Sequence, residues 1–268
     1  MFHMMVKERE DEEARGRRNI RESAVAGMFY PDRRDELLQM ISALSARAEG
    51  EPEKDVMGII VPHAGYVFSG KTACHAFRRL DRYRYKRVIV LGPNHTVYTD
   101  RIVIDTNDIW RTALGDVSID HEHVPEDVIR DEMPHKKEHS IEVEIPFLQH
   151  FLEGFSLVPL IVGDITEDNV KKYAKMIDGM MDEKTLLVIS TDLSHFLDKE
   201  EAKAVDDTTI SNITAKQGDL EACGRNPLKI AMELCRMRDR EIRLLDYSTS
   251  ADISGDSSRV VGYASFIF

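Results

Sequence analysis

The sequence predicts a single α/β domain, with a central mixed, largely parallel sheet flanked by helices. Short runs of β-branched and aliphatic residues alternate along the chain with segments in which apolar residues have helical spacing. A length of 268 residues is enough for one large domain of this class, and no low-complexity linker or break in composition divides it. A hydrophobic content of 42% with 31% charged residues is typical of a globular protein with a full core.

Each expected element follows from the spacing of its apolar residues. Strands are predicted where aliphatic runs lie between turn residues, and helices where apolar residues recur every three or four positions. The expected helices run from 32 to the turn at 50–52, and over 70–80, 139–151, 167–181, 199–216 and 227–237. The expected strands are 56–61, 87–91, 101–105, 117–119, 155–162, 185–190, 241–248 and 259–268. Pro146 is expected to kink or split the helix over 139–151, because proline lacks the N–H group of an inner helical position.

The N-terminal segment differs from the rest of the chain. Residues 1–22 are predicted to form a charged, disordered leader, because 7–18 is rich in charged residues and lacks apolar periodicity. The folded domain is therefore expected to span 23–268, with order beginning near Ala24.

Composition excludes several classes of protein. A formal net charge of -12 argues against nucleic-acid binding, which needs a basic surface. No run of eighteen apolar residues is present, so no membrane span is expected, and no secretory signal is visible. Cys74, Cys223 and Cys235 are odd in number and widely spaced, which is typical of a reduced, cytoplasmic protein without a disulfide framework.

Two histidines follow directly on predicted buried strands. His63 and His95 are separated by one strand–helix–strand unit, and a right-handed crossover places such strands side by side or one strand apart. Because ligands bind beyond the carboxyl ends of strands in open α/β sheets, both imidazoles are expected to reach one ion there. Gly65 and Gly92 allow the sharp turns that this needs. The alternative for either histidine alone is a capping or core residue that hydrogen-bonds a loop carbonyl.

A third predicted strand ends in Ser190-Thr-Asp-Leu-Ser-His195. Asp192 and His195 are three residues apart, so in a turn or a first helical turn they can face the same way. A carboxylate beside an imidazole raises its pKa and fixes its tautomer, which suits a general base or an orienting residue. The alternative is that Thr191 or Asp192 caps a short helix.

The segment from Glu138 to Glu142 also groups carboxylates with an imidazole, His139. If the segment is helical, Glu138 and Glu142 share one face with His139 beside them, although the second histidine of a zinc-binding His-Glu-x-x-His helix is missing. The alternative is a charged helix start without function. The remaining histidines and Cys74 are given no role: His121, His123 and His135 are expected to be solvated, and His75 and Cys74 to be structural.

Cys223 precedes Gly224 and the helix-starting pair Asn226 and Pro227. A thiol near a helix N-terminus has a lowered pKa and is a better nucleophile or metal ligand. The alternative is a small buried apolar residue, as most free cysteines are. The spacing alone leaves both interpretations open.

Eight blocks in order resemble the Memo family, named for a mediator of ErbB-driven cell motility, whose microbial members are called AmmeMemoRadiSam system protein B. The matching blocks begin at Ala24 and run to the C-terminus. They are 24–31, 62–66, 92–95, 138–142 with 146–148, 191–195, 222–225, 247–250 and 261–265.

The resemblance implies a fold similar to class III extradiol dioxygenases, non-haem iron enzymes in which two histidines and a glutamate hold Fe(II). It implies that His63 and His95 are retained as metal ligands and that Cys223 takes the third place. Asp192, His195 and His139 are implied to line the same pocket as candidate catalytic residues. Family members are described as binding copper or iron with redox activity, and the animal protein also as binding phosphotyrosine peptides.

Two functions follow from this resemblance. The first is a metal-binding redox protein or metalloenzyme that uses an iron or copper ion on an unknown substrate. Zinc is also considered, because thiolate in place of carboxylate favours copper or zinc over oxygen-activating iron. The alternative is a non-catalytic binding module that uses the ancestral pocket for a peptide or protein partner. The microbial family names further imply association with radical-SAM and AMMECR-type proteins; neither nucleic acid nor membrane is an expected partner.

Overall fold

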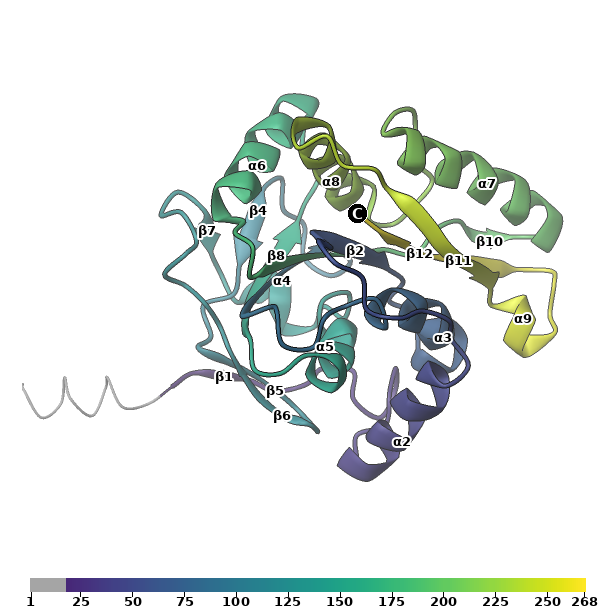
Figure 1. Ribbon diagram of the computed structural model, residues 1–268, viewed down its shortest axis with the longest axis horizontal. Coiled ribbons are helices and arrows are strands. Elements are labelled where there is room, and N and C mark those ends of the chain that lie inside the picture. The colour runs from purple at the N-terminus through teal and green to yellow at the C-terminus, as the bar shows by residue number, and fades with distance from the viewer. Residues whose placement is uncertain (1–17) are drawn as a thin grey trace, which may run out of the picture.

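The computed structural model describes residues 18–268, and the part of the predicted leader at 1–17 lies outside the described residues. Within the described residues, a nine-stranded mixed sheet lies between two layers of helices (Figure 1). The strand order is β10-β12-β2-β9-β3-β8-β4-β7, with β11 also paired to β12. The predicted fold class is confirmed.

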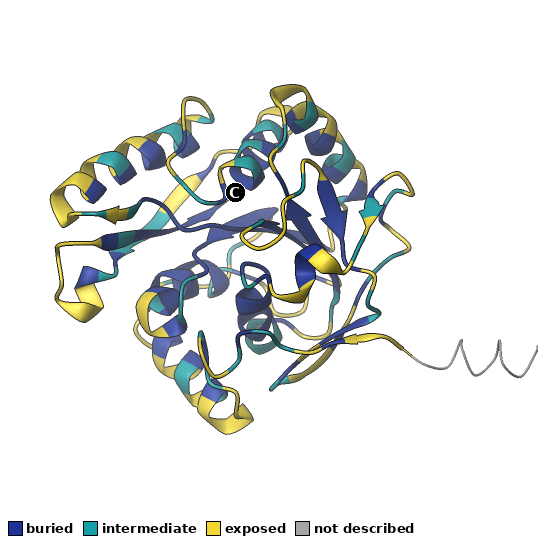
Figure 2. Cartoon of the chain, turned by 180° about the vertical axis from the view of Figure 1, so that it is seen from behind, coloured by how far each residue is buried: buried dark blue, intermediate teal, exposed yellow. Residues whose placement is uncertain are grey.

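Four parallel strands form the centre of the sheet. They are β2 (Gly58–Val61), β9 (Thr185–Ser190), β3 (Arg87–Pro93) and β8 (Ser156–Val162). Every residue of β2 and β9 is buried, as expected of parallel strands that helices cover on both faces. Figure 2 shows this buried centre between helices whose outward faces are exposed.

The strands at the two margins are mostly antiparallel to this centre. On one side β4 (Ile102–Ile104) runs antiparallel to β8 and pairs in parallel with β7 (Ile129–Arg130). On the other side β12 (Val260–Ile267) runs antiparallel to β2, and it pairs with β10 (His195–Leu197) and β11 (Arg243–Thr249). The four neighbouring central strands therefore bring their carboxyl ends side by side in the middle of the sheet.

The helices form two layers (Figure 1). One layer contains α2 (Arg34–Ser45), α3 (Tyr66–Phe77) and α5 (Ile145–Phe151). The other contains α6 (Glu167–Met180), α7 (Lys199–Ala215) and α8 (Arg225–Met237). Two single-turn helices, α4 (Met133–Lys136) and α9 (Ala251–Ser254), lie in connections. No helix of the described part of the chain is long and apolar enough to span a membrane.

A small second sheet corrects the predicted end of the leader. It consists of β1 (Ile20–Arg21), β5 (Ile109–Thr112) and β6 (Gly115–Ser118), and β5 was not expected from the sequence. Order therefore begins before Ala24, because Arg21 is buried. Its guanidinium Nη1 donates to Glu142 Oε2 at 2.7 Å.

The predicted helix over 139–151 is wrong in its first half. The chain is irregular through Ile141, forms a 3-10 turn (Glu142–Glu144), and becomes α-helical only at Ile145. Pro146 lies in the first turn of α5, where a missing N–H leaves no hydrogen bond unmade. The proline starts the helix instead of kinking it, and His139 lies in the irregular segment before the 3-10 turn.

Candidate metal centre

Three neighbouring strands deliver polar side chains to one edge. His63, Asp192 and His95 each lie two residues after the last residue of β2, β9 and β3. Because β9 lies between β2 and β3, the two histidines come from strands that are separated by one strand. Their ring centroids are 5.3 Å apart, which confirms that the two imidazoles meet at the carboxyl edge.

His139 completes the cluster from a different direction. Its ring centroid lies 5.2 Å from that of His63 and 4.9 Å from that of His95. One ligand atom from each of the three histidines lies within 4.8 Å of the others, so the cluster could hold a metal ion. A Cβ at Gly92 would meet Ser140 Oγ at 2.6 Å, so this glycine allows the segment carrying His139 to pack against the end of β3.

Glu138 orients the exposed side of the cluster. Its buried carboxylate accepts from His95 Nδ1 at 2.9 Å and from the backbone N–H groups of His95, His139 and Ser140. Although burial opposes ionisation, the hydrogen bond and charge of His95 lower the pKa of Glu138 to about 2. The same bond outweighs partial burial and raises the pKa of His95. With Nδ1 engaged, His95 has Nε2 available for a metal, the arrangement that carboxylate partners impose on metal-binding histidines.

His63 occupies the buried side of the cluster. Its backbone N–H donates to Asp192 Oδ1 at 2.8 Å, and its Nδ1 lies 2.8 Å from Ser190 Oγ. Burial, followed by the charges of His139 and His95, holds the pKa of His63 well below its ordinary value. Burial also lowers the pKa of His139. Both rings are therefore neutral near pH 7, which is the state that binds metals.

Asp192 lies behind the cluster and is not part of it. Burial raises the pKa of this carboxyl to about 7, against the effect of hydrogen bonds from the backbone of His63 and Ala64. A group that titrates near neutral pH can either give or accept a proton. Its predicted catalytic role is compatible with this position and stays a prediction.

Cys223 lies beside the three histidines. Its Sγ is 3.2 Å from His63 Nε2 and accepts from the Asp192 N–H at 3.2 Å, but the thiol is not one of the three mutually close ligand groups. The predicted lowering of its pKa is wrong. Burial and the charge of Asp192 raise the pKa to about 12, and α8 begins only at Arg225. Its role as a metal ligand stays a prediction.

The sequence suggested that Asp192 and His195 share a turn or a first helical turn, but no helical turn joins them in the structure. Residues 191–194 are irregular, and His195 begins β10 opposite Val261. The half-buried ring has a lowered pKa, through burial despite a backbone hydrogen bond at Leu193. Its predicted catalytic role remains untested.

The other histidines divide into surface and core residues. His123 is exposed, as expected. His135, expected to be solvated, is fully buried on α4, where Nε2 donates to the Val103 carbonyl oxygen at 3.0 Å and burial lowers its pKa to about 4. His121 is half-buried and donates to the Asn107 carbonyl oxygen at 2.9 Å. His75 and Cys74 are buried in α3.

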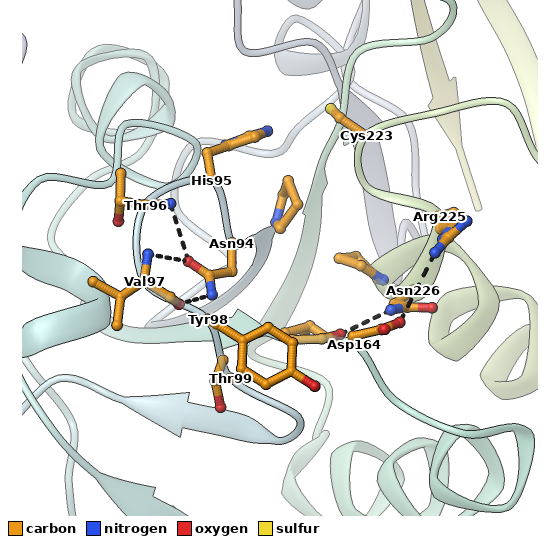
Figure 3. A pocket seen from close by; sticks show the side chains of 14 residues that line it. Asn94, His95, Thr96, Val97, Tyr98, Thr99, Asp164, Cys223, Arg225 and Asn226 are labelled. Atoms are coloured by element: carbon orange, nitrogen blue, oxygen red, sulfur yellow. Dashed lines mark hydrogen bonds and ion pairs between the residues drawn. The ribbon is translucent and has the colours of Figure 1, made fainter.

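A cavity of about 360 Å³ adjoins the cluster. It is lined by 93–99, 162–164, Cys223 and 225–227. Figure 3 shows His95 and Cys223 facing each other at its inner end, with Tyr98 and Arg225 farther out. Arg225 Nη2 lies 3.8 Å from Asp164 Oδ1, and the Tyr98 residue is 81% exposed. This volume accommodates a small molecule or one side chain of a larger ligand.

Sequence reasoning did not find the residues that orient the histidines. Glu138 was noted only as part of a charged segment, and Ser190 only as the end of a strand. Ser190 ends a buried strand in which the four preceding residues, 186–189, are apolar, and a polar residue there is the one local signal that could have identified it.

Comparisons with known proteins cover nearly the whole chain. The sequence profile of the family described as Memo-like protein matches residues 21–267. A "MEMO1 family protein" of Aquifex aeolicus is 35% identical over 270 residues, covering 93% of this chain and 99% of the relative. Proteins with the same name from Methanobrevibacter smithii and Archaeoglobus fulgidus are each 34% identical, with the same coverage of both chains.

Proposed function

This chain belongs to the family of Memo-like proteins, and we propose that it is a redox protein or metalloenzyme whose histidine cluster binds an iron or copper ion. The observation that carries this proposal is the convergence of His63, His95 and His139, with one ligand atom from each within 4.8 Å. Imidazole nitrogens suit iron, copper and zinc. When bound, such an ion supplies Lewis acidity and one-electron exchange.

The donor atoms fit a transition-metal ion. His63 and His95 each have Nδ1 held by a side chain, Ser190 or Glu138, which leaves Nε2 for the ion. The nearby carboxylates are already engaged: Glu138 by three backbone N–H groups, and Asp192 by the backbone of His63. A face of three imidazoles is therefore favoured over two imidazoles and a carboxylate.

Other side chains would handle protons and substrate. Asp192, with a pKa of about 7, is suited to hold a proton beside the cluster. His195 is proposed as a second proton-transfer group, in keeping with its lowered pKa. The cavity next to His95 and Cys223 would admit the substrate, whose reacting atoms would meet the cluster at the inner end.

The proposed metal site is tested by metal content after anaerobic purification. The wild-type chain is expected to retain about one iron or copper ion, and His63→Ala to lose it, since imidazoles supply all the proposed ligands. His123→Ala removes an exposed histidine outside the cluster and is the matched control. Equal metal content in all three proteins would contradict the proposal.

A second comparison identifies the third ligand. His139→Ala and Cys223→Ala each remove one candidate donor, imidazole or thiol. If the cluster is the site, His139→Ala should weaken Fe(II) binding more than Cys223→Ala. The reverse order would support the ligand set that the family resemblance implies.

The alternative function is a binding module, and the exposed Tyr98 and Arg225 at the cavity favour it. An exposed aromatic ring and a guanidinium suit a peptide or small-molecule ligand. If this function is correct, a chain without metal should keep its affinity for that ligand. A screen of the apo and iron-loaded chains against the same peptide library, by calorimetry, distinguishes the two functions.

A further inference from the structure

Ser190 lies at the centre of a buried hydrogen-bond network behind His63. Its Oγ is 2.8 Å from His63 Nδ1, 3.0 Å from Glu144 Oε1 and 2.5 Å from the Ser140 carbonyl oxygen. All four residues are buried, with 2% exposure or less. No bulk water is therefore in contact with these groups, and each polar atom must be satisfied within the network.

The single hydroxyl proton of Ser190 determines where the other protons lie. Two bare oxygen acceptors would repel each other at 2.5 Å, so the Ser190 O–H must donate to the Ser140 carbonyl oxygen. A serine has one proton to donate and two lone pairs that accept. Ser190 therefore accepts from both remaining neighbours, which requires a proton on His63 Nδ1 and a proton on Glu144.

The surroundings of Glu144 agree with a neutral carboxyl. Its Oε2 has no hydrogen-bond partner among residues 18–268, and the buried guanidinium of Arg21 is paired with Glu142 instead. Of the titratable groups nearby, Asp192 would add negative charge, and the Tyr66 hydroxyl donates to the Val143 carbonyl oxygen. Burial raises the pKa of Glu144 well above its ordinary value. An ionised carboxylate in this place would have no positive charge beside it to offset the cost of burying its negative charge.

We propose that Glu144 is a neutral carboxylic acid that donates its proton to Ser190, and that Glu144 and Ser190 together position His63. Both lone pairs of Ser190 then accept hydrogen bonds, and its own O–H donates to the Ser140 carbonyl oxygen, so the hydroxyl has a single orientation. His63 is then held as the Nδ1–H tautomer, and its Nε2 lone pair faces the cluster. The effect on metal binding rests on the proposed function, whereas the proton on Glu144 does not.

Infrared difference spectroscopy tests the proton directly, in the metal-free chain. The wild type minus Glu144→Gln spectrum at pH 7 should contain the C=O band of a protonated carboxyl. In Ser190→Ala that band should shift to higher frequency, because the acid loses its acceptor. A carboxylate band in the difference spectrum would overturn the proposal. Should Glu144→Gln fail to fold, the shift in Ser190→Ala decides alone, and an unshifted band would count against the proposal.

Fe(II) affinity, measured anaerobically, tests the positioning role. Ser190→Ala should weaken binding about 10–100-fold, as loss of a residue that orients a metal ligand does. Glu144→Gln keeps a neutral N–H donor to Ser190 and should change the affinity by less than ~10-fold. Equal losses in both variants would mean that Glu144 acts as an anion and would contradict the proposal.

A spectroscopic signature separates positioning from a general loss of structure. In ¹⁵N-histidine-labelled wild type and Glu144→Gln, His63 should show a protonated Nδ1 and an unprotonated Nε2. In Ser190→Ala the two tautomers should mix, while the signals of His135 and His121 stay unchanged. If the wild type binds no Fe(II), the metal-site proposal fails, and the infrared and NMR results still decide the state of Glu144.

Discussion

Two buried polar networks share the segment 138–144, and they differ in how fully each carboxyl is paired. Glu142 accepts from Arg21, from the Tyr30 hydroxyl and from two backbone N–H groups, so both its oxygens are satisfied. Glu144, two residues on, has only Ser190 at one oxygen and nothing at the other among the described residues. The first network joins the N-terminal segment to the domain, and the second lies behind the histidine cluster.

The difference indicates which buried groups serve stability and which serve the site. A carboxylate with an arginine and several N–H donors is compensated for burial, so its removal should affect folding. In the histidine cluster, burial and then the charges of neighbouring histidines lower the pKa of His63 and His139. Such perturbed groups gather at functional sites.

The largest expected effect is on the Glu142 network. Arg21→Met should lower the free energy of unfolding by about 3–5 kcal/mol, because it leaves a buried carboxylate without its cation. Urea denaturation of the metal-free chain measures this change. Arg33→Met, at a surface pair with Glu36, is the control and should cost no more than about 1 kcal/mol. Similar losses in both variants would mean that Arg21 contributes no more than a surface ion pair, and would contradict the stabilising role given to the Glu142 network.

Gly92→Ala should have a smaller effect on stability and a direct effect on the cluster. Its Cβ would meet Ser140 Oγ at 2.6 Å and Ile141 Cγ1 at 2.7 Å, so the segment that carries His139 must move. A loss of about 1–3 kcal/mol in stability is expected from this overpacking, together with weaker Fe(II) binding. Gly179→Ala, in α6 with open space around its Cβ, is the matched control and should be neutral or stabilising. Unchanged Fe(II) affinity in Gly92→Ala would show that the approach of His139 is not needed.

The third expected effect is the pH dependence that Asp192 contributes. Burial raises its pKa from 3.8 to about 7. Between these values the folded chain keeps a proton that the unfolded chain has released, so this contribution to stability is full below about pH 4 and is lost as the pH rises toward 7. Asp192→Asn cannot titrate and should remove this fall. His63, with its lowered pKa, acts in the opposite direction below 6.5 in both proteins.

Unfolding of the wild type and Asp192→Asn at a series of pH values between 4 and 8 checks this prediction. The difference between the two curves isolates Asp192, because His63 and His95 are common to both proteins. Parallel curves would mean that Asp192 titrates at its ordinary value.

The strands and long helices could be predicted because their signals are local. Runs of aliphatic residues predicted β2, β3, β8 and β9, and apolar residues at helical spacing predicted α2, α6 and α7. Three strand ends carrying polar residues predicted the edge at which His63 and His95 meet. These inferences needed only the periodicity of the chain and the topology of parallel sheets.

The rest depended on contacts between distant segments. The irregular path of 138–141 is set by its packing against Gly92, and the early start of order by the pairing of Arg21 with a residue 121 positions away. The pKa of Cys223 follows from burial beside Asp192, and a nearby helix start did not reveal it. No local pattern encodes these contacts, so His139 could be named as a pocket residue but not as a member of the cluster.

X-ray absorption spectroscopy of the Fe(II)-loaded chain tests the central claim most directly, because the signal reports the atoms bound to the ion. We expect scattering from three imidazole rings, contributed by His63, His95 and His139, with the loss of one ring in His139→Ala. Two imidazoles and a sulfur in the wild type would instead make Cys223 the third ligand. An iron environment without imidazole scattering would contradict the account.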